Sequence, residues 1–133
     1  MKVVRSLLSV CLGFAVFFGI VRGMTLVVGS GPDTSGAYTN GPVMNYLIES
    51  LSWTVGAALI SGFITAWIAG SREFPHAAAL SLLMVIASYV SMRQEGISQP
   101  GWYQTSVAGC GPLAAMIGAA IRILAKQRRA SRA

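Results

Sequence analysis

Four long apolar segments set the limit on what this chain can fold into. A helix needs about 20 mostly apolar residues to cross the roughly 30 Å apolar core of a bilayer. Only 11% of the 133 residues are charged, against about 25% in an average soluble domain. The sequence therefore predicts an all-α integral membrane four-helix bundle, with residues 1–133 forming a single transmembrane domain. The predicted helices cover residues 6–28, 46–70, 76–92 and 102–124.

The lysines and arginines predict how the bundle is oriented. With the N-terminus in the cytoplasm, eight of them fall on the cytoplasmic side, while Arg22 and Arg93 fall toward the outer side. An excess of positive charge marks cytoplasmic loops, so both termini are expected to be cytoplasmic, in a multi-pass protein of the bacterial inner membrane. Residues 125–133 are predicted to be a basic cytoplasmic tail. The eight are Lys2, Arg5, Arg72, Arg122, Lys126, Arg128, Arg129 and Arg132.

The net charge of +6 also bears on partners. Because the positive residues flank apolar segments, the bilayer and its anionic lipids are the expected partner, and nucleic acid is not. The first segment has a second interpretation, a cleaved signal peptide, since Lys2 and Arg5 precede an apolar run. That run continues past Arg22 to Val28, and the cleavage motif at Val28 and Ser30 is weak. An uncleaved helix is the favoured interpretation.

Small residues recur at every fourth position in three of the segments. Such residues allow helix backbones to approach closely in lipid, where the hydrophobic drive between helices is small. They predict contact faces inside a compact bundle, and a seam between copies remains the alternative. The three sets are Cys11, Ala15, Gly19 and Gly23; Ala58, Gly62, Ala66 and Gly70; and Gly111, Ala115 and Ala119.

Pro112 lies inside the fourth segment and predicts a kink, because proline removes one backbone hydrogen bond. A broken helix that lines a transport site is the alternative. The two cysteines, Cys11 and Cys110, are expected at depths about 10 Å apart in a core of roughly 30 Å. A disulfide requires Cα atoms within about 7 Å, so both are expected to be unpaired.

Arg22 and Glu49 are charged residues that fall within the outer half of the apolar segments, where charges are costly and become candidates for function. A helix from Ser6 and another from Tyr46, each rising about 1.5 Å per residue, place both side chains about 5 Å below the outer surface. Because consecutive helices are usually neighbours, the sequence predicts an Arg22–Glu49 ion pair. Separate snorkelling of the two side chains to the surface is the alternative.

Arg72, Glu73 and His76 gather at the turn between the second and third segments. The favoured interpretation is an interfacial polar cluster at the inner surface, with His76 as a polar anchor. Metal sites usually need several ligands of the right type, and His76 is the only histidine. No catalytic residue, cofactor or metal ligand is predicted.

The chain resembles a broad group of small bacterial four-span membrane proteins without an assigned activity. The resemblance rests on GFITAWIAGSREFPHA (residues 62–77), on PGWYQ (residues 100–104) and on the small residues around Pro112. It implies a four-helix integral membrane protein and no substrate. We expect a non-enzymatic accessory or structural subunit that contacts another membrane protein or itself. The alternative is a small homo-oligomeric transporter or channel that uses Arg22, Glu49 and the Pro112 region.

Overall fold

The computed structural model describes residues 2–28, 41–70, 73–94 and 100–132, and these residues form an all-helical bundle. Its helices are α1 (Lys2–Val28), α2 (Gly41–Ala69), α3 (Glu73–Gln94) and α4 (Gly101–Ala130). All four are long and apolar enough to cross a membrane. The coarse fold prediction, four potential spanning helices in an all-α protein, is therefore confirmed.

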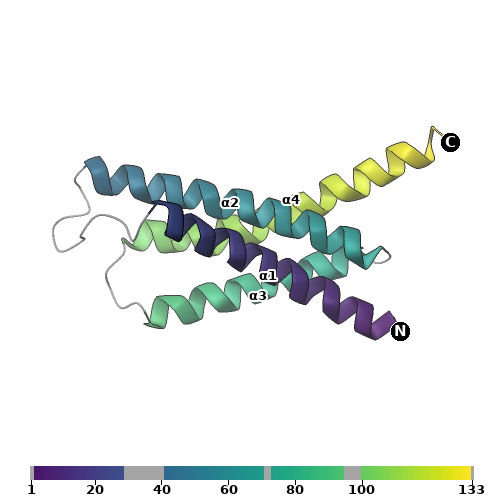
Figure 1. Cartoon of the computed structure of the whole chain (residues 1–133), viewed down its shortest axis with the longest axis horizontal. Coiled ribbons are helices and arrows are strands. Elements are labelled where there is room, and N and C mark those ends of the chain that lie inside the picture. The colour runs from purple at the N-terminus through teal and green to yellow at the C-terminus, as the bar shows by residue number, and fades with distance from the viewer. Residues whose placement is uncertain (1, 29–40, 71–72, 95–99, 133) are drawn as a thin grey trace.

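The four helices run in alternating directions, so the N-terminal end of α1 and the C-terminal end of α4 lie at the same end of the bundle (Figure 1). Helix α2 is central: it packs along α1 on one side and most extensively along α4 on the other. Helix α3 packs mainly on α4, and α1 contacts α2 and α3. Within the described residues, α1 and α4 make no contact.

The helices are longer than the sequence predicted. Residues 125–130, expected in a basic tail, continue α4, and α3 begins at Glu73. Pro75 is therefore the third residue of α3, a position whose backbone N–H has no intrahelical acceptor in any helix. Gly70 ends α2 with a positive φ of 66°, and its N–H bonds to the carbonyl of Ala66 at 3.3 Å. This left-handed residue after the last turn is a common helix stop, which glycine adopts at least cost.

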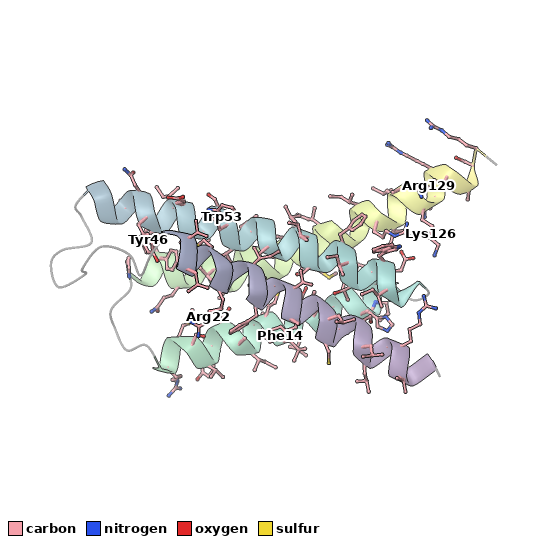
Figure 2. The ribbon with its side chains drawn as sticks, in the orientation of Figure 1. Phe14, Arg22, Tyr46, Trp53, Lys126 and Arg129 are labelled. Atoms are coloured by element: carbon pink, nitrogen blue, oxygen red, sulfur yellow. The ribbon has the colours of Figure 1, made fainter. Side chains whose placement is uncertain are left out.

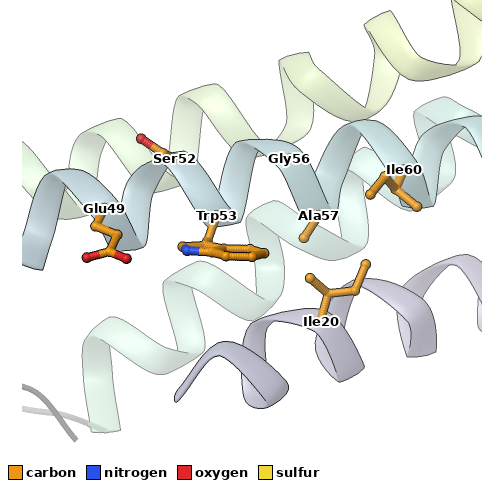
Figure 3. A pocket seen from close by; sticks show the side chains of 7 residues that line it. All are labelled: Ile20, Glu49, Ser52, Trp53, Gly56, Ala57 and Ile60. Carbon is orange, nitrogen blue, oxygen red and sulfur yellow. The ribbon is translucent and has the colours of Figure 1, made fainter. Parts of the chain in front are cut away.

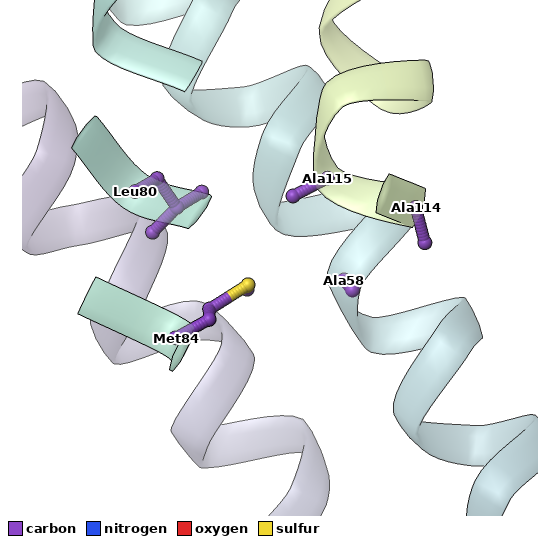
Figure 4. Close-up of a cluster of buried hydrophobic side chains, with 5 residues drawn as sticks. All are labelled: Ala58, Leu80, Met84, Ala114 and Ala115. Atoms are coloured by element: carbon purple, nitrogen blue, oxygen red, sulfur yellow. The ribbon is translucent and has the colours of Figure 1, made fainter. Parts of the chain in front are cut away.

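Small residues close the core between α2, α3 and α4. One buried cluster joins Ala58 of α2 to Leu80 and Met84 of α3 and to Ala114 and Ala115 of α4 (Figure 4). Ala66 of α2 and Ala119 of α4 are also fully buried. Ala58, Ala66, Ala115 and Ala119 belong to the small-residue sets that the sequence singled out in the second and fourth segments.

Two glycines bring the backbones of α2 and α4 into direct contact. A Cβ on Gly62 would lie 2.0 Å from the carbonyl oxygen of Ala115, and one on Gly118 would lie 2.1 Å from that of Leu59. Real Cβ atoms do not approach so closely, so any side chain at these positions must push the helices apart. In lipid, such close contact is a main source of helix association.

The small-residue set of α1 does not line the bundle, which corrects the prediction for that helix. Ala15 and Gly19 are exposed, and a Cβ on Gly19 or Gly23 would meet nothing within 4 Å. The contact face of α1 instead contains Gly13, where a Cβ would lie within 1.8 Å of Thr65 Oγ1 on α2. Since two residues are about 200° apart around a helix, burial of Gly13 turns Ala15 away from the bundle.

Candidate functional site

Polar side chains at the end of the bundle that carries both termini hold the helices together. Figure 2 shows Lys126 and Arg129 toward this end, and Arg22 and Tyr46 toward the other. Lys126 Nζ lies 2.8 Å from Glu73 Oε1 and donates to the carbonyl oxygen of Gly70 at 2.9 Å. One ammonium group thus connects α4 to the start of α3 and to the end of α2.

Two side chains of α1 complete this network. Arg5 Nε donates to the carbonyl oxygen of Ile68 at 2.8 Å, one of the carbonyls at the end of α2 that lack an intrahelical partner. Ser6 Oγ shares a hydrogen bond of 2.5 Å with His76 Nε2 on α3. We call the side chains of Arg5, Ser6, Glu73, His76 and Lys126 the inner network.

The inner network differs from the polar cluster that the sequence predicted at this turn, because its members bind partners on other helices. Glu73 is 7% exposed and binds Lys126 of α4, while His76 binds Ser6 of α1. The carboxylate and the imidazole therefore connect α3 to two different helices. Arg72 lies outside the described residues. The partners Arg5, Ser6 and Lys126 lie more than 50 residues away in the chain, and no local spacing in the sequence signals such contacts.

Hydroxyl groups make further polar contacts between helices. Ser81 Oγ of α3 donates to the carbonyl oxygen of Pro112 at 3.0 Å, and Ser50 Oγ of α2 shares a 2.9 Å hydrogen bond with the Tyr103 hydroxyl of α4. Helix α4 continues across Pro112 from Gly101 to Ala130. The hydrogen bond from Ser81 to the Pro112 carbonyl thus joins α3 to the middle of an uninterrupted helix.

The structure does not pair Arg22 with Glu49. The Arg22 guanidinium lies over the Phe18 ring, with Cζ 5.9 Å from the ring centroid. Among the described side chains, the ion pair within 4.0 Å is that of Lys126 with Glu73. The expected Arg22–Glu49 contact is therefore replaced by a contact within α1.

The register of α1 against α2 explains this difference. Gly13 faces Thr65 and Ser61, and Ile20 shares a groove with Ala57. Because α1 and α2 are antiparallel, the numbers of two residues that face each other have a constant sum, here about 77. Arg22 then lies opposite Val55, six residues from Glu49. At about 1.5 Å per residue the two side chains start roughly 9 Å apart along the bundle. The prediction assumed equal depths for Arg22 and Glu49, whereas this register places Glu49 nearer the end of the bundle opposite the termini.

Glu49 belongs to an open groove on the side of α2 next to α1, with a volume of about 370 Å³. Figure 3 shows the Glu49 and Trp53 side chains on the same side of α2, and Ile20 of α1 facing Ala57 further along that helix. The wall is otherwise mostly apolar, and Glu49 is its one ionisable side chain. The groove is lined by Ile20, Glu49, Ser52, Trp53, Gly56, Ala57 and Ile60.

Two buried polar atoms have no hydrogen-bond partner among the described residues, Thr65 Oγ1 and Arg122 Nε. Thr65 Oγ1 points at Gly13, where the Cα–H group supplies only a weak donor. Cys11 and Cys110 are free and exposed, on two helices that do not touch. Within the described ranges, no three His, Cys, Asp or Glu side chains come together as metal ligands.

Comparison with known proteins gives no match: no protein-family model, no curated protein and no solved structure is significantly similar to this chain.

Proposed function

We propose that the chain is a non-enzymatic, multi-pass protein of the bacterial cytoplasmic membrane that acts as an accessory or structural subunit. Both termini lie in the cytoplasm in this proposal. The resemblance to small bacterial four-span proteins and the excess of lysine and arginine at the end that carries both termini support this location.

The observation that carries the proposal is the use of the polar groups. Glu73 and Lys126 bind each other, Ser6 binds His76, and Ser81 binds the backbone at Pro112. Each of these contacts joins two different helices. Polar groups that are occupied in holding helices together favour a structural role over one in chemistry.

Native mass spectrometry of the tagged full chain, extracted gently from its own host membrane, tests the proposal. We expect a complex with a different membrane protein in a fixed ratio. A monodisperse homo-oligomer that moves a solute across reconstituted vesicles would contradict the accessory role.

The second candidate function is a small homo-oligomeric transporter or channel, and the groove at Glu49 and Trp53 favours it. An open groove of about 370 Å³ with a single carboxylate falls within the volume range of small-molecule sites. Against it, Arg22 and Pro112 do not line this groove, so the three features do not form one pathway within a single copy. Flux in vesicles that is lost in Glu49→Gln would favour this second function.

A further inference from the structure

Helix α1 has a face that no other described helix covers, and this face carries Arg22. Gly13 is buried against α2, whereas Ala15, Phe18, Gly19 and Arg22 are exposed. Residues three and four apart share one side of a helix, so these four form a continuous surface. We call it the Arg22 face.

Arg22 lies well inside the proposed membrane core. About 20 helical residues cross a core of roughly 30 Å, so a core that begins at Ala69, the last residue of α2, extends to Glu49. Arg22 lies opposite Val55, which places its Cα about 9 Å below that outer surface by the helical rise. Its guanidinium leans onto Phe18, one turn closer to the membrane centre.

This chain supplies no carboxylate for Arg22 among the described residues. Glu73 is paired with Lys126 at the opposite end of the bundle, and Glu49 starts about 9 Å away along the bundle by the register of α1 and α2. An unpaired arginine inside the apolar core of a bilayer is energetically costly. Arginines at such depth usually face a partner group rather than lipid.

We propose that the Arg22 face docks a transmembrane helix of a different membrane protein, and that this helix carries an Asp or Glu opposite Arg22. Ala15 and Gly19 have no bulk to hold the partner backbone away, which lets a short acidic side chain reach the guanidinium. This inference rests on the proposed accessory function and names the chemistry of the partner.

A second copy fits this face less well. Two copies related by a two-fold axis along the membrane normal, with these faces in contact, place Arg22 near its own symmetry mate. Two positive charges in a medium of low dielectric repel strongly. A helix with a carboxylate at that depth neutralises the charge instead.

Arg93 provides a matched control, because it also lies over an aromatic ring four residues earlier. Its Cζ is 5.2 Å from the centroid of Tyr89, and it donates a hydrogen bond to the Tyr89 hydroxyl. Arg93 is in the last turn of α3, at the end of the span, so it needs no acidic partner within the membrane.

The test uses the full chain with an acceptor fluorophore at its C-terminus, reconstituted in vesicles of phosphatidylcholine and phosphatidylglycerol. The probes are two donor-labelled Leu/Ala transmembrane peptides, identical except for one Glu or one Gln placed about six residues, or 9 Å, from one end of the apolar stretch. We expect energy transfer to report at least tenfold tighter association of the Glu peptide with the natural chain.

The variants assign this preference to the Arg22 face. Arg22→Gln removes it, Arg22→Lys keeps most of it, and Arg93→Gln leaves it unchanged. Gly19→Leu weakens binding of the Glu peptide although the charge remains, because leucine holds the backbones apart. Equal affinity for the two peptides, or a preference that survives in Arg22→Gln, overturns the proposal. Dimerisation of the chain itself that depends on Arg22 also overturns it and assigns the face to a second copy.

Failure of this inference is distinct from failure of the accessory function. If a different membrane protein co-purifies in a fixed ratio but the Glu peptide shows no preference, the docking face is wrong and the accessory role stands. If the chain moves solutes as a homo-oligomer, the accessory role is wrong. The docking face still stands in that case if the natural chain prefers the Glu peptide and Arg22→Gln removes this preference.

Discussion

Lys126 Nζ lies 2.8 Å from Glu73 Oε1 and joins two helices whose contacting residues are 53 positions apart in sequence. The pair is asymmetric, since the Glu73 side chain is 7% exposed and that of Lys126 is 53% exposed. The carboxylate is therefore the buried member, and it depends on the lysine more than the lysine depends on it.

Loss of the lysine should destabilise the bundle, because it leaves a buried carboxylate without its cation. We expect Lys126→Met to lower the free energy of unfolding by about 1–3 kcal/mol, measured by denaturation in detergent micelles. Arg129→Met, an exposed cation one turn further along α4, is the control and should have little effect. With Glu73→Gln, the double variant should lose less than the two single variants together. Strict additivity would show that the pair contributes no coupling.

The contact between α2 and α4 predicts a sharp difference between two glycines of the same helix. Gly62→Ala places a Cβ 2.0 Å from the Ala115 carbonyl oxygen, and a backbone atom cannot move aside without shifting the helix. We expect a loss of about 1–3 kcal/mol, as for other overpacked cores. Gly56→Ala, where a Cβ meets nothing within 4 Å, should be neutral or stabilise α2 by about 0.5–1 kcal/mol. Equal effects of the two variants would contradict this packing.

The contact between α1 and α2 predicts a compensating pair. Gly13→Ala brings a Cβ within 1.8 Å of Thr65 Oγ1 and should destabilise the protein by about 1–3 kcal/mol. Thr65→Ala removes the clashing hydroxyl, so Gly13→Ala in the Thr65→Ala background should cost at least 1 kcal/mol less, roughly the coupling of residues in contact. The measurement is the same denaturation in micelles. The absence of rescue would mean that α1 and α2 meet in another register.

Composition and apolar length were enough to predict four helices, because each segment must satisfy its own backbone hydrogen bonds in lipid. The same information left the register between helices undetermined. The predicted Arg22–Glu49 pair shows the consequence: it assumed equal depths for the two side chains, whereas the register of α1 and α2 offsets them by about six residues, roughly 9 Å along the axis. A shift of that size separates two side chains that the sequence placed together.

Spacing of small residues also proved ambiguous, for a different reason. In α2 and α4 the repeats at Ala58, Gly62 and Ala115 lie in the closest contacts of the bundle, while in α1 the repeat at Ala15 and Gly19 faces outward. A period of four says that residues share a face, but which neighbour covers that face depends on the other helices. The inner network was hidden for the same reason, since Arg5, Ser6 and Lys126 meet their partners only after the bundle forms.

The last prediction concerns the side of the membrane on which each part of the chain lies. Helices in alternating directions with both termini at one end (Figure 1) require an even number of crossings if all four helices span. Lysine and arginine at that end favour the cytoplasm. In a background with Cys11→Ser and Cys110→Ser, a membrane-impermeant maleimide added to intact cells should label Ser35→Cys and not Arg129→Cys. Arg129→Cys should react only after the membrane is opened.

Labelling of both sites in intact cells would mean that the chain inserts in two orientations, and labelling of Arg129→Cys alone would reverse the proposed topology. Either result would also move Arg22 to the cytoplasmic half of the bilayer in some or all copies, and with it the depth at which a partner must carry its carboxylate.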